Sequence, residues 1–207
     1  MKTHNKTITF IFAVILLSAC VDRNEYAYKY ESNPTFGWGY AEFFGKFYSR
    51  YDINKNVLSL SLFTDSLKVN DKGNLTGFGQ YLFFEDIFLN EGDTILPDGV
   101  YNSSDNYHEF TFTPGSEYEN DGLKYTIGAY MVFVEKDASK SKLQLVKEGS
   151  FTVNSIGSKQ SINCTLILDN DSVIHGKFTA PLPYLDESVN ASLNVRKRKV
   201  NVQEFLK

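Results

Sequence analysis

The stretch Val57 to Phe63, VLSLSLF, decides the class of fold. Leucine stands at every second position from Leu58 to Leu62, and a serine separates each pair. Successive side chains on a β-strand point to opposite faces, so this alternation predicts a strand with a leucine face toward a core and a serine face toward solvent.

Strand-like runs continue on both sides of this stretch. Turn signals separate them at intervals of about 8 to 12 residues, which is typical of antiparallel sandwiches and barrels. Examples are Pro97 with Asp98-Gly99, and Asn170-Asp171, which predicts a β-hairpin. The runs are 77–89 (GFGQYLFFEDIFL), 109–113, 123–135 (LKYTIGAYMVFVE), 143–153, 161–168, 172–179 and 189–195, with a polar loop at 64–76.

No stretch shows a sustained helical period with caps at both ends, and only Val200 to Leu206 fits a short terminal helix. We therefore predict an all-β fold with few or no helices. An antiparallel β-sandwich is the first choice, and a calycin-like β-barrel is the alternative.

The first 19 residues have the features of a secretion signal. Lys2 and Lys6 form a positive start, an apolar run follows from Ile8 to Leu17, and Ser18-Ala19 are small residues before a cleavage point. The apolar run is shorter than the roughly 20 residues that a transmembrane helix needs. We predict a signal peptide at 1–19, an anchor and tether at 20–34 and one all-β domain at 35–207.

The sequence Leu17-Ser18-Ala19-Cys20 resembles the lipobox of bacterial lipoproteins. The resemblance implies that Cys20 is diacylated through its sulfur and becomes the mature N-terminus, which attaches the protein to the membrane. A plain signal peptide with a cysteine at the cleavage site is the alternative.

The mature chain is then expected to be acidic and free of disulfides. Removing residues 1–19 leaves 188 residues (207 minus 19) and removes two of the 21 basic residues, so 19 remain against 25 acidic ones and the net charge is about −6. This charge makes nucleic acid an unsuitable partner. Cys164 is the other cysteine, and its phase with Ile162 and Leu166 predicts a place on a core face.

Aromatic residues and glycines concentrate at 35–51, with Phe36, Trp38 and Tyr40 near the start. One interpretation is a platform on which a sugar or apolar ligand stacks, with Trp38 as the best candidate. The other is that one face of a bent strand packs in the core, where aromatic side chains bury a large area. Glycine within such a strand marks a bulge or the close approach of another backbone.

The sequence offers no catalytic residue, metal site or cofactor motif. His108 and His175 are the histidines of the mature chain, and neither lies in a nucleophile-bearing motif. The oxygen-rich turn 169–171 lacks the ligand spacing of a calcium loop. The basic run 196–199 is either a contact for acidic glycans or lipid headgroups, or a protection against pairing at a sheet edge.

Several segments in order resemble the small, all-β surface lipoproteins of Bacteroides-type gut bacteria. They are FGWGYAEFFGKFY, VLSLSLF, ILPDGVY and the final hairpin from EGSFTV to FTAPLPY. The resemblance implies a cell-envelope location, at the outer membrane or cell surface, without an assigned activity. Three Asp-Ser/Thr-apolar stretches also resemble the O-glycosylation sequon of these bacteria, and they offer Ser66, Thr94 and Ser172 as modification sites.

From these patterns we predict a lipid-anchored envelope protein that is not an enzyme. The first expectation is a non-catalytic binding or adhesion module for a glycan or an envelope protein. The alternatives are a structural or accessory subunit of a surface complex or fimbria, and, third, a glycan-processing enzyme.

Overall fold

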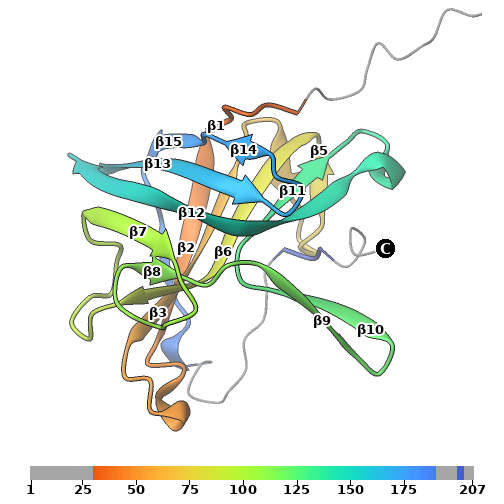
Figure 1. Ribbon diagram of the computed structural model, residues 1–207. Coiled ribbons are helices and arrows are strands. Elements are labelled where there is room, and N and C mark those ends of the chain that lie inside the picture. The colour runs from red at the N-terminus through yellow and green to blue at the C-terminus, as the bar shows by residue number, and fades with distance from the viewer. Residues whose placement is uncertain (1–29, 190–199, 203–207) are drawn as a thin grey trace, which may run out of the picture.

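A computed structural model describes residues 30–189 and 200–202 (Figure 1). The predicted signal peptide, Cys20, nearly all of the predicted strand at 189–195 and the basic run 196–199 lie outside these residues. Helical structure in the described part is limited to short segments, including the 3-10 helices η1 (Ser49–Tyr51) and η2 (Ala138–Lys140).

The described residues form sixteen strands. They are β1 (Thr35–Phe36), β2 (Trp38–Gly45), β3 (Asn56–Phe63), β4 (Leu67–Val69), β5 (Leu75–Gly77), β6 (Gly79–Leu89), β7 (Gly99–Ser103), β8 (Thr111–Phe112), β9 (Ser116–Asn120), β10 (Leu123–Ile127), β11 (Tyr130–Val134), β12 (Lys142–Ile156), β13 (Lys159–Leu168), β14 (Val173–Ile174), β15 (Lys177–Ala180) and β16 (Tyr184–Asp186).

Twelve of these strands form one continuous sheet that closes on itself. Strand β11 pairs with both β12 and β6, while β7 and β8 join the same two strands on the other side, so that five strands form a closed ring. Strands β3, β2 and β16 extend the ring beyond β6, and β13, β15 and β1 extend it beyond β12. The all-β prediction is confirmed, and the closed ring is compatible with the barrel alternative.

Aromatic rings fill the interior of the ring. Phe151 stacks on Tyr101 at 4.6 Å between ring centroids, and Phe84 lies 4.9 Å from both Phe112 and Phe151. All four of these side chains are buried. The same core continues between the two extensions, where leucines of β3 meet Ile162, Cys164 and other apolar residues of β13. The predicted core position of Cys164 is therefore confirmed.

Strand β3 differs from its prediction because both of its faces are buried. Its leucines enter the main core, while the serine face lies under a second apolar cluster that includes Phe63, Tyr81 and Tyr130. Ser61 is within hydrogen-bond distance of the Tyr81 hydroxyl (3.2 Å), and Ser59 donates to Glu42 (3.1 Å). The prediction that the serine face meets solvent is wrong, because the next hairpin and more distant segments cover it.

Two segments that cover the serine face of β3 were predicted to be a loop and a helix, and both are extended where the structure describes them. The predicted loop 64–76 contains the β4–β5 hairpin, whose leucines join the second cluster. Val200 and Val202 join it too, and Asn201 forms a parallel bridge with Asn74. The described start of the predicted terminal helix is therefore extended chain.

The predicted single strand 123–135 is two strands, β10 and β11, that belong to different sheets. The chain breaks at Gly128, which has a φ of +75°, where a Cβ would lie 2.0 Å from the carbonyl oxygen of Pro114. Strands β9 and β10 form a separate hairpin that projects from the barrel (Figure 1).

In the part of the chain that the structure describes, no helix has both the length and the apolar character needed to cross a membrane.

Candidate binding surface

The predicted aromatic platform is divided between two places. Phe36 is 1% exposed and belongs to the main core, so it is not available to a ligand at the surface. Trp38 and Tyr40 are half-buried on the other face of the sheet. Trp38 stacks on Phe63 at 3.9 Å, and its indole Nε1 donates a hydrogen bond to the carbonyl oxygen of Leu67 (3.0 Å). These contacts give Trp38 a packing role between β3 and the β4–β5 hairpin.

A different aromatic surface lies at one end of the barrel, where three connections meet. They are the β2–β3 connection (46–55), the β6–β7 connection (90–98) and the β7–β8 loop (104–110). We call this end the loop surface. In Figure 1 it occupies the lower left of the barrel, with η1 at the bottom. Loops held by a rigid scaffold often carry binding residues.

Polar contacts join the three connections to one another. Lys46 contacts Glu91 at 2.8 Å, and Lys55 contacts Glu109 at 2.8 Å. Asn56 donates from its Nδ2 to the carbonyl oxygens of Glu91 and Asp93, both at 2.9 Å. Hydrogen bonds from Lys46 and Lys55 lower the pKa values of the Glu91 and Glu109 carboxyls, respectively, so both carboxylates stay ionised below their usual range. These contacts link the three connections of the loop surface to one another.

Four aromatic rings lie together on the loop surface. Tyr107 packs on Phe88 at 5.4 Å and on Tyr48 at 6.5 Å, and Phe47 packs edge-on against Tyr48 at 4.9 Å. The Tyr48 hydroxyl donates to Asp86 at 2.9 Å. Tyr107 remains 47% exposed, so one part of its ring is fixed by packing while another part meets solvent.

The backbone of Tyr107 has a φ of +28°, which is uncommon for a residue with a side chain. Such conformations persist only where the surrounding structure determines them, and they cluster at functional sites. Three residues after Tyr48, Tyr51 of η1 is exposed and carries the Arg50 guanidinium 4.7 Å above its ring. Tyr48 and Tyr51 lie in the aromatic segment 35–51 that the sequence indicates. Tyr107 has no signal in the sequence beyond its place next to His108.

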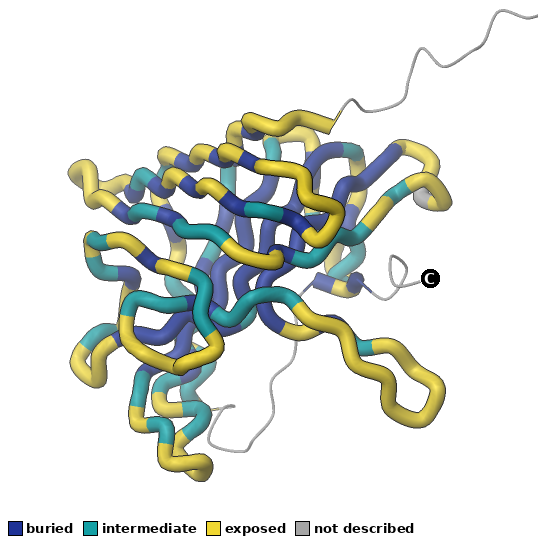
Figure 2. The backbone as a smooth tube through the Cα atoms, viewed as in Figure 1, coloured by how far each residue is buried: buried dark blue, intermediate teal, exposed yellow. Residues whose placement is uncertain are grey.

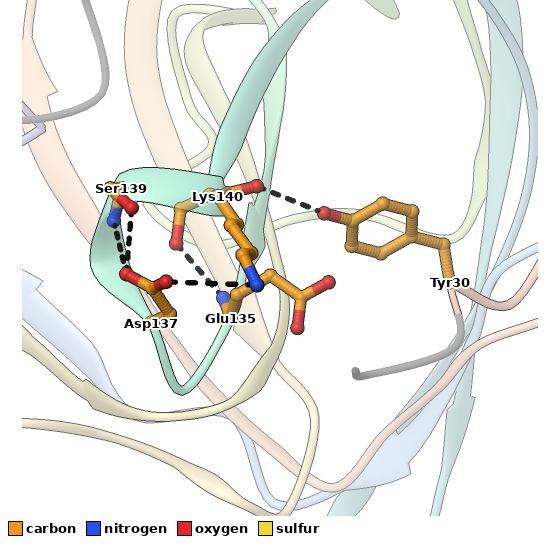
Figure 3. Close-up of polar contacts among 6 residues, drawn as sticks. Tyr30, Glu135, Asp137, Ser139 and Lys140 are labelled. Atoms are coloured by element: carbon orange, nitrogen blue, oxygen red, sulfur yellow. Dashed lines mark hydrogen bonds and ion pairs between the residues drawn. The ribbon is translucent and has the colours of Figure 1, made fainter. Parts of the chain in front are cut away.

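The N-terminal segment is fixed at the opposite end of the barrel from η1. The Tyr30 ring packs on Phe133 at 4.6 Å, and its hydroxyl donates to the carbonyl oxygen of Lys140 at 3.4 Å (Figure 3). Burial and the nearby Glu135 carboxylate raise the pKa of Tyr30 to about 12. In Figure 1 the described chain begins at the top of the barrel, while η1 lies at the bottom.

The three predicted modification sites are exposed. Ser66 lies in the turn before β4, Thr94 in the β6–β7 connection and Ser172 in the turn of the β13–β14 hairpin. That hairpin was predicted from Asn170-Asp171, and its pairing is confirmed. A transferase could reach all three hydroxyls, and Ser172 also lines a groove of about 330 Å³ beside Tyr30.

Neither histidine of the described residues forms a catalytic arrangement. His108 is exposed in the β7–β8 loop, and His175 is exposed with its Nδ1 3.2 Å from the Thr165 hydroxyl. Burial raises the pKa of the Cys164 thiol to about 11, which makes it a poor nucleophile. Within residues 30–189 and 200–202, no three His, Cys, Asp or Glu side chains gather as metal ligands would.

Comparisons with protein-family models, with curated proteins and with solved structures found no match to this chain.

Proposed function

We propose that this protein is a lipid-anchored, non-catalytic binding module of the bacterial envelope, and that its loop surface binds a glycan. Cys20 carries the lipid, and the protein belongs with the small surface lipoproteins that its sequence resembles, at the outer membrane or cell surface. The observation that carries the binding role is Tyr107, an exposed ring held in a strained backbone conformation on a packed aromatic base.

The chemistry of the loop surface favours a sugar. The C–H faces of a pyranose ring pack on aromatic rings, and its hydroxyls bond to charged and polar side chains. Tyr107 and Tyr51 offer the rings, while Arg50 and the Lys55–Glu109 pair offer the polar groups. Contacts between the loops already hold Tyr107 and the Lys55–Glu109 pair, which reduces the ordering entropy that opposes binding at these groups.

The placement of the N-terminal segment supports the same role. From Cys20 to Tyr30 the chain makes ten steps, which span at most about 35 Å. An anchor at Cys20 would therefore hold the Tyr30 end of the barrel near the membrane. The η1 side of the loop surface would then face away from the bilayer, where an extracellular ligand is accessible.

A thermal-shift screen of residues 22–207 against host and dietary glycans tests the binding role. A glycan at about 100 times its dissociation constant stabilises a protein by about 2.7 kcal/mol. Each kcal/mol raises the melting temperature of a domain of this size by roughly 2 to 4 °C. We expect Tyr107→Ala to abolish this shift. Trp38→Phe is the control, because Trp38 lies outside the loop surface, and it should leave the shift unchanged. A panel without any shift, or a shift that only Trp38→Phe removes, would contradict the proposal.

Metabolic labelling with a palmitate analogue tests the anchor. We expect label on the wild-type protein and none on Cys20→Ala, which keeps the rest of the signal intact. Equal labelling of the two proteins, or none on either, would contradict lipid attachment at Cys20.

A further inference from the structure

The hairpin of β9 and β10, which we call the arm, is a second candidate surface, and it is independent of the loop surface. It forms its own two-stranded sheet and extends away from the barrel (Figure 1), and most of it is exposed (Figure 2). All five residues of β9 are exposed. An isolated two-stranded hairpin is marginally stable in water, and the arm does not belong to the sheet of the barrel. The length of the arm therefore calls for an explanation other than packing in the barrel core.

The two faces of the arm differ in chemistry. On one face Tyr118 and Tyr125 form a cross-strand pair and stack at 5.1 Å. Leu123 and Ile127 lie on the same face, because they are two positions from Tyr125, and they are 60% and 39% exposed. The other face is acidic along β9, where Glu117 and Glu119 flank Tyr118, and Lys124 pairs only with Glu119.

One edge of the arm is open. Among the described strands, β9 pairs with β10 alone, so its other edge presents unpaired backbone groups. Sheet edges of this kind are usually protected by charged side chains, proline or a bulge. β9, with the sequence SEYEN, has no proline, and its pairing with β10 has no register shift, so its two glutamates are its protection. Such an edge opposes an acidic strand but is suited to receive a strand of complementary charge.

A second copy of this chain does not fit that edge. If two β9 strands paired antiparallel about Tyr118, each Glu117 would lie opposite the Glu119 of the other copy. Like charges directly opposite each other destabilise a strand pair, and this pairing would contain two such contacts. A strand with basic side chains at these two positions would instead form two opposite-charge pairs.

We propose that the open edge of β9 binds an extended strand of a protein partner. The strand carries lysine or arginine on the face of Glu117 and Glu119 and apolar side chains on the face of Tyr118. Backbone hydrogen bonds supply the general affinity, and the alternating side chains supply the selectivity.

The probe that tests this is the fluorescein-labelled pentapeptide Val-Lys-Val-Lys-Val, whose alternation matches SEYEN. The controls are Val-Glu-Val-Glu-Val and a lysine peptide with N-methylated backbone amides, titrated by fluorescence anisotropy. Opposite-charge and like-charge cross-strand pairs differ enough that we expect about tenfold tighter binding of the lysine peptide than of the glutamate peptide. We also expect E117K/E119K/K124E, which keeps opposite charges at the paired positions 119 and 124, to reverse this preference while the melting temperature stays unchanged.

The N-methylated peptide separates strand pairing from simple attraction between charges. We expect its binding to be about tenfold weaker or worse, because it cannot donate to the β9 edge. Equal binding of the two lysine peptides would overturn the proposal, as would the absence of binding at millimolar peptide. Dimerisation that the lysine peptide disrupts, detected by sedimentation, would identify a second copy as the occupant of the edge and would also overturn it. None of these outcomes depends on whether the loop surface binds a glycan.

Discussion

The side-chain amide of Gln80 pairs with the backbone of Glu31 in both directions. Gln80 Nε2 donates to the carbonyl oxygen of Glu31 at 3.1 Å, and its Oε1 accepts from the Glu31 amide at 2.8 Å. Gln80 is 0% exposed, so β6 holds the N-terminal segment from within the barrel wall. Further along, the amides of His175 and Lys177 donate to the carbonyl oxygens of Ser32 and Pro34 at 2.7 and 3.0 Å.

We predict that Gln80→Leu loosens this end of the protein. Leucine has a similar size but removes both hydrogen bonds to Glu31, and two such bonds together contribute about 1 to 3 kcal/mol. The free energy of unfolding should fall by that amount, and amide hydrogen exchange at Glu31 should accelerate more than at Phe178 of β15. Unchanged exchange at Glu31 would show that the Gln80 pair does not hold the segment.

A second prediction concerns the glycines of the aromatic segment. A Cβ on Gly39 would lie 2.5 Å from the carbonyl oxygen of Ser61 and 2.8 Å from Leu62 Cδ2, because β2 and β3 approach closely there. We expect Gly39→Ala to destabilise the protein by about 1 to 3 kcal/mol in urea unfolding, as overpacking does. Gly92→Ala is the matched control, because a Cβ on Gly92 meets nothing within 4 Å. Equal effects of the two substitutions would refute the close approach.

A third prediction tests the aromatic interior. Phe151 stacks on Tyr101 with ring planes 5° apart and also contacts Phe84. Phe151→Ala should cost about 3 to 5 kcal/mol, since the cavity left in a ring-filled core cannot collapse fully. Ile156→Ala, at a 57% exposed position of the same strand, should change the free energy of unfolding by no more than about 0.5 kcal/mol. A similar loss for both would place Phe151 outside the stabilising core.

The sequence predicted correctly those features of the structure that depend on neighbouring residues in the chain. Alternation at 57–63 located β3, and the phase of Cys164 located its core face, because both follow from the two-residue period of a strand. The buried serine face of β3 could not be predicted, since the period of a strand does not show what packs on its faces, and Tyr130 and Val200 of the second cluster are remote in sequence. Closure of the ring likewise depends on the pairing of β11 with both β6 and β12.

The loop surface shows the same limit for function. The composition of 35–51 indicated aromatic residues but not which of them stay accessible, and Trp38, the best candidate by residue type, is committed to Phe63 and to the Leu67 carbonyl. The proposed role of Tyr107 rests on a backbone conformation at φ +28° and on contact with Phe88 of β6. Neither feature has a sequence signature.

The last prediction concerns Cys164 in alkaline solution. Burial raises the pKa of its thiol from 9.0 to about 11, so the fold favours the neutral form. The stabilisation from this group is therefore complete below pH 9 and is lost as the pH rises toward 11. Because a tenfold change in an acid dissociation constant corresponds to about 1.4 kcal/mol, the loss approaches about 3 kcal/mol.

Urea unfolding of the wild-type protein and Cys164→Ala between pH 9 and pH 11 measures this loss directly. Tyrosines such as the half-buried Tyr40, whose pKa burial raises to about 12, also weaken the fold in this range, but they are common to both proteins. The difference between the two curves thus isolates Cys164, and we expect the variant to lose less stability as the pH rises. Parallel curves would mean that the thiol ionises as easily in the folded chain as in the unfolded one, which would contradict its place in the core.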